Sequence, residues 1–343
     1  MARNKSMVRQ MNFHSTSSSR RNLLLGVAAA SLFPYSSFAQ APAWPTRAVK
    51  IVVATGPGSG TDTIARLLAP RLEAIWKQPV IVENKAGAGG IIGTEYTLAA
   101  NDGHTLLMAS PSTLLAKYTT RNLRFDPLTD LIPVYRVANL PVLFVTNAKT
   151  AQRAKTLAEI AALSKSTQHG IFFAGAGRAS FFNLSMGILS KPMGVRYSPV
   201  DFNGMGPLTL ALLRDDAQLA LSGPVAVKGQ IDSKDLHALA VVDSKRLAAL
   251  PNVPTFEEAI GYKGYLPISW GGILVPKGTP VAVVNVIARD FATLYADEPA
   301  RKLVEDRVLG TMLQSSPAQF AKEYAEEANV WKNTFATLGI APE

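Results

Sequence analysis

Cysteine is absent from the 343-residue sequence, and histidine is scarce. The missing thiols exclude disulfide bonds, thiolate metal sites and cysteine nucleophiles, so packing has to stabilise the fold. The histidines beyond the N-terminal region are His104, His169 and His237, and none has His, Asp or Glu at metal-ligand spacing. We therefore predict no metal site, no cofactor and no catalytic residue, and we expect surface or structural roles for these histidines.

Signatures of phosphate and nucleic-acid binding are also missing. The glycine-rich segment 87–93 places its third glycine one residue too far for the dinucleotide fingerprint, and no glycine loop ends in GKS or GKT. The formal net charge is +10, but residues 1–39 hold five basic residues and no acid, so the rest of the chain carries +5. Because this charge is mild and no basic block with interleaved aromatics follows, we expect small anions rather than nucleic acid as partners.

The N-terminal apolar stretch is too short to span a bilayer, which takes about 20 residues. Polar and basic residues precede the stretch from Leu23 to Phe33, and small residues follow at Ser37-Phe38-Ala39. This order is typical of a cleaved signal peptide, here residues 1–39. Arg20-Arg21 ahead of the leucines resembles a twin-arginine export signal, with an ordinary secretory signal as the alternative. Both predict an exported protein.

Strands and helices alternate along the rest of the chain, which predicts an α/β fold with mostly parallel sheets. In the first part, apolar runs and helical spacing predict strands at 49–54, 80–83 and 105–109 and helices at 61–76 and 91–100. Thr61 or Asp62 is expected to cap the first of these helices.

The same pattern restarts at residue 141, which suggests a second lobe. Strands are expected at 141–146, 170–173, 219–221 and 238–242, and helices at 156–164, 182–189 and 207–214, with another starting at 222–224. The chain then returns through 265–274 to three amphipathic helices at 281–295, 299–309 and 317–338. We therefore predict one lobe from residues 40–140 plus 265–343 and another from residues 141–264.

Three loops rich in glycine, serine and threonine follow predicted strands, at 56–62, 110–113 and 175–180. Parallel sheets present ligands at this position to helix N-termini, which favour anions. Glycine lets backbone N–H groups approach a carboxylate, and the hydroxyls add hydrogen bonds. Each loop alone is also explained by ordinary turn chemistry, so the argument for binding rests on finding three of them in two lobes.

Several short motifs, in the same order, resemble tripartite tricarboxylate transporter substrate-binding receptors, also called Bug-type periplasmic binding proteins. The first are Trp44-Pro45 followed by the segment 58–66, which reads GSGTDTIAR. The later ones are the segments 82–90, 102–107, 204–207, 236–241, 250–255 and 270–280. The resemblance covers essentially the whole chain after the signal peptide.

The resemblance implies a periplasmic-binding-protein type II fold, with two α/β lobes joined by two crossing strands. The protein would be a monomeric periplasmic receptor without metal or cofactor. It would bind a small mono-, di- or aromatic carboxylate between the lobes and pass it to the membrane permease subunits of a tripartite transporter. Two alternatives stay open: an exported α/β enzyme using Asp62 as acid or base, and a sensory co-receptor.

The ligand contacts that the resemblance implies come from both lobes. In the first lobe they are Gly58, Ser59, Gly60, Thr61, Asp62 and Ser110, and in the second Gly175, Gly177, Arg178, Ser180, Phe181, Ser222 and Gly223.

This sequence departs from the family pattern at positions that affect specificity. Thr55-Gly56 stands where phenylalanine and proline are common, and Ser222-Gly223 lacks a frequent aspartate, which weakens an amino-acid assignment. Arg178 is expected either to pair with a second ligand carboxylate or to be a solvated loop residue. Phe181 and Phe182 are expected either to line the pocket or to pack within the lobe.

Overall fold

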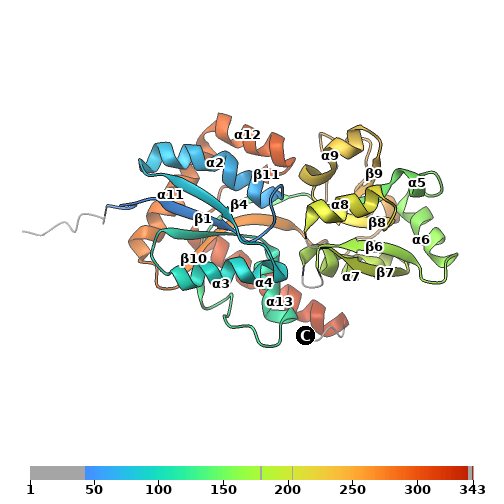
Figure 1. Ribbon diagram of the computed structural model, residues 1–343, viewed down its shortest axis with the longest axis horizontal. Helices are drawn as coiled ribbons and strands as arrows, with labels where there is room; N and C mark the ends of the chain where they lie inside the picture. Colours follow the sequence, from blue (N-terminus) through green and yellow to red (C-terminus); the bar gives the residue numbers. More distant parts are fainter. Residues whose placement is uncertain (1–42, 178–179, 203, 339–341, 343) are drawn as a thin grey trace, which may run out of the picture. The chain divides into compact units, whose positions relative to one another are not determined.

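Two mixed β-sheets organise the computed structural model, which describes residues 43–177, 180–202, 204–338 and 342 (Figure 1). The predicted signal peptide lies outside the described residues, as does Arg178. Within the described part, no helix is both long and apolar enough to cross a membrane.

The first sheet has the strand order β11-β4-β10-β3-β1-β2. Its strands are β1 (Val49–Val53), β2 (Val80–Asn84), β3 (Thr105–Ala109), β4 (Leu131–Leu140), β10 (Ser269–Pro276) and β11 (Thr311–Met312). Strands β1, β2 and β3 are mutually parallel. Strand β4 runs in the same direction as β3, because both are antiparallel to the strand β10 between them.

The second sheet has the order β7-β6-β8-β5-β9. Its strands are β5 (Leu143–Asn147), β6 (Ile171–Gly175), β7 (Tyr197–Asp201), β8 (Leu219–Ser222) and β9 (Leu236–Val241). Strands β6, β7 and β8 are parallel, and β5 is antiparallel to both β8 and β9. Most strands in each sheet therefore share one direction, as predicted.

The chain passes between the sheets twice. Pro141 and Val142 connect β4 to β5, and residues 242–268 lead from β9 back to β10. Each sheet is thus built from the segments predicted for one lobe, and the α/β fold class is confirmed. By contacts, however, the chain from Ala43 to Glu343 is one compact unit, so the lobe boundaries stay a prediction.

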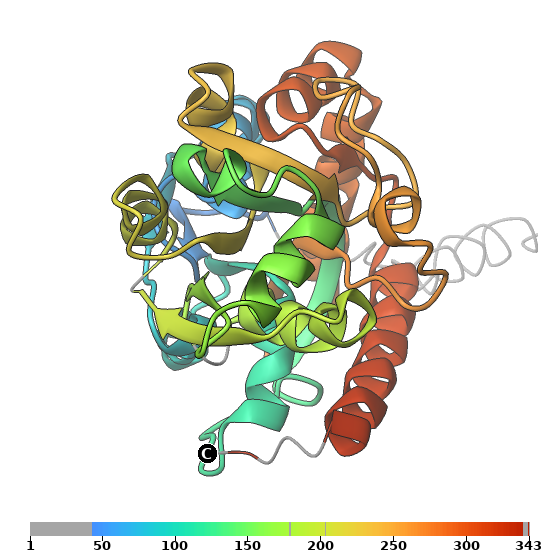
Figure 2. The same ribbon diagram turned by 90° about the vertical axis from the view of Figure 1, so that its right-hand side faces the viewer.

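Helices flank both sheets (Figures 1 and 2). They are α2 (Gly60–Trp76), α3 (Ile91–Ala100), α4 (Pro111–Thr119), α5 (Ala148–Ala151), α6 (Leu157–Lys165), α7 (Phe181–Met193), α8 (Met205–Leu213), α9 (Pro224–Asp232), α10 (Phe256–Ile260), α11 (Val281–Ala296), α12 (Glu298–Val308) and α13 (Pro317–Leu338), with the 3₁₀ turn η1 at Ala88–Gly90. Helix α2 shows why they form: Ile64, Leu68 and Leu72 recur every four residues and are fully buried.

Strand β4 was not predicted, although it lies inside the first sheet. Pro133 and Arg136 interrupt its apolar pattern, and proline is rare in the interior of a sheet. The structure accommodates Pro133 at a register shift, where β10 pairs Ile273 with Tyr135 and Leu274 with Pro133. Strand β7, helix α4 and the short elements α5, α10 and β11 were also not predicted.

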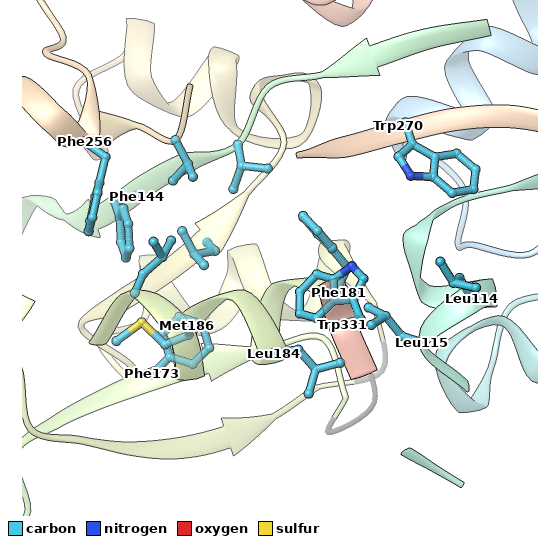
Figure 3. Close-up of a cluster of buried hydrophobic side chains, with 14 of the residues drawn as sticks. Leu114, Leu115, Phe144, Phe173, Phe181, Leu184, Met186, Phe256, Trp270 and Trp331 are labelled. Carbon is cyan, nitrogen blue, oxygen red and sulfur yellow. The ribbon is translucent and has the colours of Figure 1, made fainter. Parts of the chain in front are cut away.

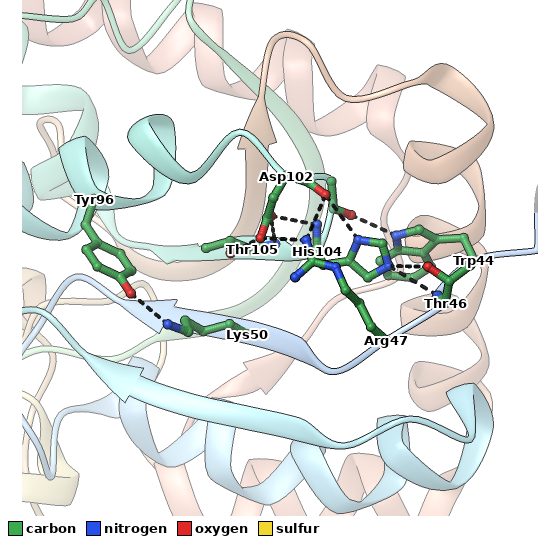
Figure 4. Close-up of polar contacts among 9 residues, drawn as sticks. Trp44, Thr46, Arg47, Lys50, Tyr96, Asp102, His104 and Thr105 are labelled. Carbon is green, nitrogen blue, oxygen red and sulfur yellow. Dashed lines mark hydrogen bonds and ion pairs between the residues drawn. The ribbon is translucent and has the colours of Figure 1, made fainter.

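The motif Asp102-Gly103-His104 has a structural role, holding the start of the described chain against β3 (Figure 4). The Asp102 carboxylate accepts hydrogen bonds from the backbone N–H groups of His104 (2.9 Å) and Thr105 (2.8 Å). The Trp44 indole donates to the Gly103 carbonyl at 2.8 Å, and Arg47 pairs with Asp102 at 3.0 Å. His104 thus belongs to a turn, in agreement with a structural role.

A continuous apolar core extends from the first sheet to the second (Figure 3). It includes Trp270 of β10, Phe173 of β6, Phe181 of α7 and Trp331 of α13, all nearly inaccessible to solvent. The rings of Phe181 and Trp331 meet edge to face with centroids 6.2 Å apart. Phe181 thus packs against a helix from the segment predicted for the other lobe, and its role in ligand binding stays a prediction.

Glu327 of α13 ties that helix to the core. Its carboxylate accepts hydrogen bonds from the indole N–H groups of Trp270 at 2.7 Å and Trp331 at 3.3 Å. Burial raises the pKa of Glu327, because the apolar surroundings disfavour the charged form. The folded state therefore holds this proton more tightly than the unfolded chain does, and the resulting stabilisation is present at low pH and is lost as pH rises through the raised pKa.

We expect Glu327→Gln to remove part of the pH dependence of stability. As pH rises from below 4.5, the ordinary pKa of Glu, to above the raised one, the unfolding free energy of the wild type should fall relative to the variant by on the order of 1 kcal/mol. Urea denaturation across pH measures this difference. Glu326→Gln, on the exposed face of α13, is the control, and equal pH profiles for wild type and Glu327→Gln would contradict the assignment.

Candidate functional site

A cavity of about 760 Å³ is lined by loops that follow strands of both sheets. Glycines and small hydroxyl residues make up much of its wall, together with Ile92, Leu140, Phe181, Phe182, Met205 and Val225. Among the described lining residues none has a charged side chain. Its size lies within the roughly 300–1,000 Å³ typical of small-molecule sites.

Six described α-helices begin at this cavity. Their N-cap residues, which all line it, are Ser59 of α2, Gly90 of α3, Ser110 of α4, Ser180 of α7, Gly204 of α8 and Gly223 of α9. The first N–H groups of a helix lack partners within the helix, and the helix dipole adds partial positive charge there. The cavity therefore favours an anionic group although no charged side chain of the described lining faces it.

Three hydroxyl groups form a cluster where β1 leads into α2. The Thr55 Oγ1 atom lies 2.6 Å from both Ser59 Oγ and Thr61 Oγ1, and the last two are 3.2 Å apart. Ser59 Oγ also accepts a hydrogen bond from the backbone N–H of Asp62 at 3.2 Å. Ser59 is thus the cap of α2, and the prediction that Thr61 or Asp62 caps it is wrong. These hydroxyls offer a ligand both donors and acceptors.

Asp62 faces away from the cavity and is not among its lining residues. Its buried carboxylate accepts hydrogen bonds from the Gly58 N–H at 2.9 Å and from Asn84 Nδ2 at 2.8 Å. It also pairs with Arg66 at 2.9 Å. Asp62 therefore stabilises the conformation of the loop from the side opposite the cavity, and this role needs no contact with a ligand.

The loop after β3 links the two sheets through one hydrogen bond. Ser112, at the start of α4, accepts it at Oγ from the backbone N–H of Phe181, the first residue of α7, at 3.0 Å. Both residues line the cavity. The wall of the cavity is thus closed by a polar contact between elements that flank different sheets.

The N-terminus of α7 is capped by the protein's own side chains. Ser180 Oγ accepts from the Asn183 N–H at 3.3 Å, and Asn183 Oδ1 accepts from the Ala176 N–H at 3.0 Å. Gly175 leaves room for Asn183, because a Cβ at Gly175 would lie 2.3 Å from Asn183 Oδ1. Gly175 is therefore required for packing behind the cavity wall.

The structure brings most of the predicted contacts together. The cavity is lined by Ser59, Gly60, Thr61, Ser110, Gly177, Ser180, Phe181 and Gly223. The predicted residues Gly58, Asp62, Gly175 and Ser222 are not part of its lining. Ser222 is buried, and its hydroxyl donates to the Gly223 carbonyl at 3.2 Å. Arg178 lies outside the described residues, so its role stays a prediction.

The glycine loop after β2 was not predicted to take part in the site. Residues 86–90 line the cavity, with Gly87 at φ 135° and Gly90 at φ 96°, a region that favours glycine. In the sequence this loop fails the dinucleotide fingerprint and belongs to the family-like segment 82–90, but neither feature marked it as a ligand contact. Its position directly after a strand is the same signal that identified the other three loops. No comparable signal in the sequence indicated that Met205 and Val225 line the cavity.

Comparison with known proteins identifies the family. The model of the tripartite tricarboxylate transporter family receptor matches residues 64–340, more than half of the chain. The chain belongs to this receptor family. The receptor is 33% identical over 252 residues to Protein BugT of Bordetella pertussis, covering 73% of this chain and 76% of BugT.

Solved structures of related receptors have the same fold. The periplasmic binding protein BugD, at 28% identity, superposes with a TM-score of 0.81, over 88% of this receptor and 100% of BugD. Rpa4515 of R. palustris, solved with adipate, has the same identity, coverage and TM-score. MatC of Rhodopseudomonas palustris, with bound malate, has 27% identity and a TM-score of 0.78, over 85% of this receptor and 99% of MatC. The predicted fold, that of a two-lobed periplasmic binding protein, is confirmed.

We expect Thr61→Val to weaken ligand binding more than it weakens the fold. Valine keeps the shape of Thr61 but removes its hydroxyl from the cluster, which should lower affinity about 10-fold if the ligand hydrogen-bonds there. Isothermal titration calorimetry measures the affinity. Thr63→Val on the same helix, outside the cavity, is the matched control. Equal affinities for wild type and Thr61→Val would remove this hydroxyl from the site.

Asp62→Asn should weaken the fold more than it weakens ligand binding. The amide loses the charged partner of Arg66 and one acceptor for Gly58 or Asn84, so the free energy of unfolding should fall by about 1–3 kcal/mol. Ligand affinity should fall by less than it falls in Thr61→Val. Chemical denaturation and calorimetry measure the two quantities. A folded Asp62→Asn protein of normal stability that no longer binds would show that Asp62 contacts the ligand.

Proposed function

We propose that this receptor binds a small organic carboxylate in its cavity, in agreement with the receptor role predicted from the sequence. The observation that carries the proposal is the convergence of six helix N-termini on one cavity without charged side chains in its described lining. Helix N-termini bind carboxylates through backbone N–H groups and the helix dipole. Rpa4515 and MatC, which share the fold, were solved with adipate and malate, both carboxylates.

We further propose that the protein works in the periplasm and delivers its ligand to the permease subunits of a tripartite transporter. Support comes from the family, whose description names this transporter, and from residues 1–39, which have the order of a signal peptide. A monomer that opens and closes around its ligand fits this role.

Binding without chemistry is the third part of the proposal. The enzymatic alternative depended on Asp62, whose carboxylate is engaged by Gly58, Asn84 and Arg66 outside the cavity. No group of three or more potential metal-ligating side chains gathers within the described part of the chain. A receptor of this kind holds its ligand and releases it unchanged.

A thermal-shift screen of the purified protein, refolded to remove carried-over ligand, tests the function. Carboxylates should raise the melting temperature because a ligand that binds only the folded state stabilises it. Amino acids, sugars and polyamines are the comparison classes. A shift with sugars or polyamines and none with carboxylates would overturn the proposal. Each hit is then incubated with the protein and analysed by mass spectrometry, where a new product would reveal an enzyme.

A further inference from the structure

The polar groups of the cavity are concentrated on the side of the first sheet. The hydroxyl cluster of Thr55, Ser59 and Thr61 lies there, and so do Ser110 and Ser112. No hydrogen bond to the backbone N–H groups of Gly60 and Thr61 is found within the described residues. This side can thus surround a carboxylate with hydroxyls and free N–H donors.

The side of the second sheet is mainly apolar. Phe181, Phe182, Met205 and Val225 line it. Phe181 is buried, whereas Phe182 and Met205 are half-buried and so have surface to offer a ligand. Ile92 of α3, a helix between two strands of the first sheet, also lines the cavity, and its side chain is 49% exposed. Apolar side chains left uncovered around a cavity gain stability when an apolar ligand removes them from water.

On that apolar side a second carboxylate would meet backbone N–H groups without a described partner, such as those of Met205 and Gly206 at the start of α8, but no cluster of hydroxyl groups among the described lining residues. At the start of α7, the N–H groups of Phe181 and Asn183 are taken by Ser112 and Ser180. Helix α9 begins with Pro224, which has no N–H to donate. No described lining residue carries a positive charge, and burying an unpaired carboxylate is strongly unfavourable.

We infer that the ligand has a single carboxylate, held at the hydroxyl cluster, and an apolar aliphatic or aromatic body that packs on Phe182 and Met205. This inference rests on the proposed function and narrows its ligand class from carboxylates in general to amphipathic monocarboxylates. The sequence-based alternative, in which Arg178 pairs with a second ligand carboxylate, predicts the opposite preference. A ligand with two carboxylates would then bind more tightly than a ligand with one.

Three matched six-carbon probes and one aromatic acid separate these possibilities. Hexanoate has one carboxylate, adipate has two and 1-hexanol has none, while 3-phenylpropionate offers an aromatic body. Their dissociation constants are measured by isothermal titration calorimetry on the refolded protein. We expect at least one monocarboxylate to bind about 10-fold or more tightly than adipate and than hexanol, because only it matches both ends of the cavity.

The other outcomes contradict the inference in distinguishable ways. Adipate binding as tightly as the better monocarboxylate, or more tightly, would overturn the inference but leave carboxylate binding intact, and loss of that affinity in Arg178→Ala would assign it to Arg178. Hexanol binding as tightly as hexanoate would overturn the proposed function as well. Binding of none of the four probes would overturn the inference directly.

Phe182→Ala tests the contact with the apolar body. We expect the affinity for the better monocarboxylate to fall about 10-fold, since the lost ring no longer covers the ligand. Phe172→Ala is the matched control, because Phe172 is 39% exposed on β6 and outside the cavity lining. Met205→Ala serves as a second variant if Phe182→Ala unfolds. Unchanged affinity in a folded variant of either residue would overturn that contact.

Discussion

The free N–H groups at helix N-termini are the constraint on which this structure depends. A helix leaves its first N–H groups without partners, and a buried helix end has to find them elsewhere. In the described part of this receptor six helices begin at one cavity. Those N–H groups that stay without a partner are the donors with which the proposed carboxylate would bond.

The protein satisfies these helix ends unequally. At the start of α7, Ser112 and Ser180 accept hydrogen bonds from the N–H groups of Phe181 and Asn183, and α9 begins with proline. The end of α2 has hydroxyl groups beside it and N–H donors without a described partner. Because hydroxyl groups gather at the start of α2, while Phe182, Met205 and Val225 lie at the starts of α7, α8 and α9, the cavity has a polar side and an apolar side.

The cavity wall and the apolar core share residues. Phe181 lines the cavity and packs on Trp331 of α13. Trp331 in turn shares Glu327 with Trp270 of β10. A ligand that shifts Phe181 would therefore act on a buried contact between α7 and the helix that covers the first sheet.

Sequence alone determined the fold class, most of the helices and strands, and three loops of the site, because apolar periodicity and glycine-rich turns are local signals. It missed β4, where Pro133 breaks the local pattern and only pairing with β10 supplies the strand. Asp62 and Thr61 are neighbours in sequence, yet the first turn of α2 directs one inward to the loop and the other to the cavity. Which side chains face the ligand was decided by tertiary structure, because direction depends on packing between segments far apart in the chain.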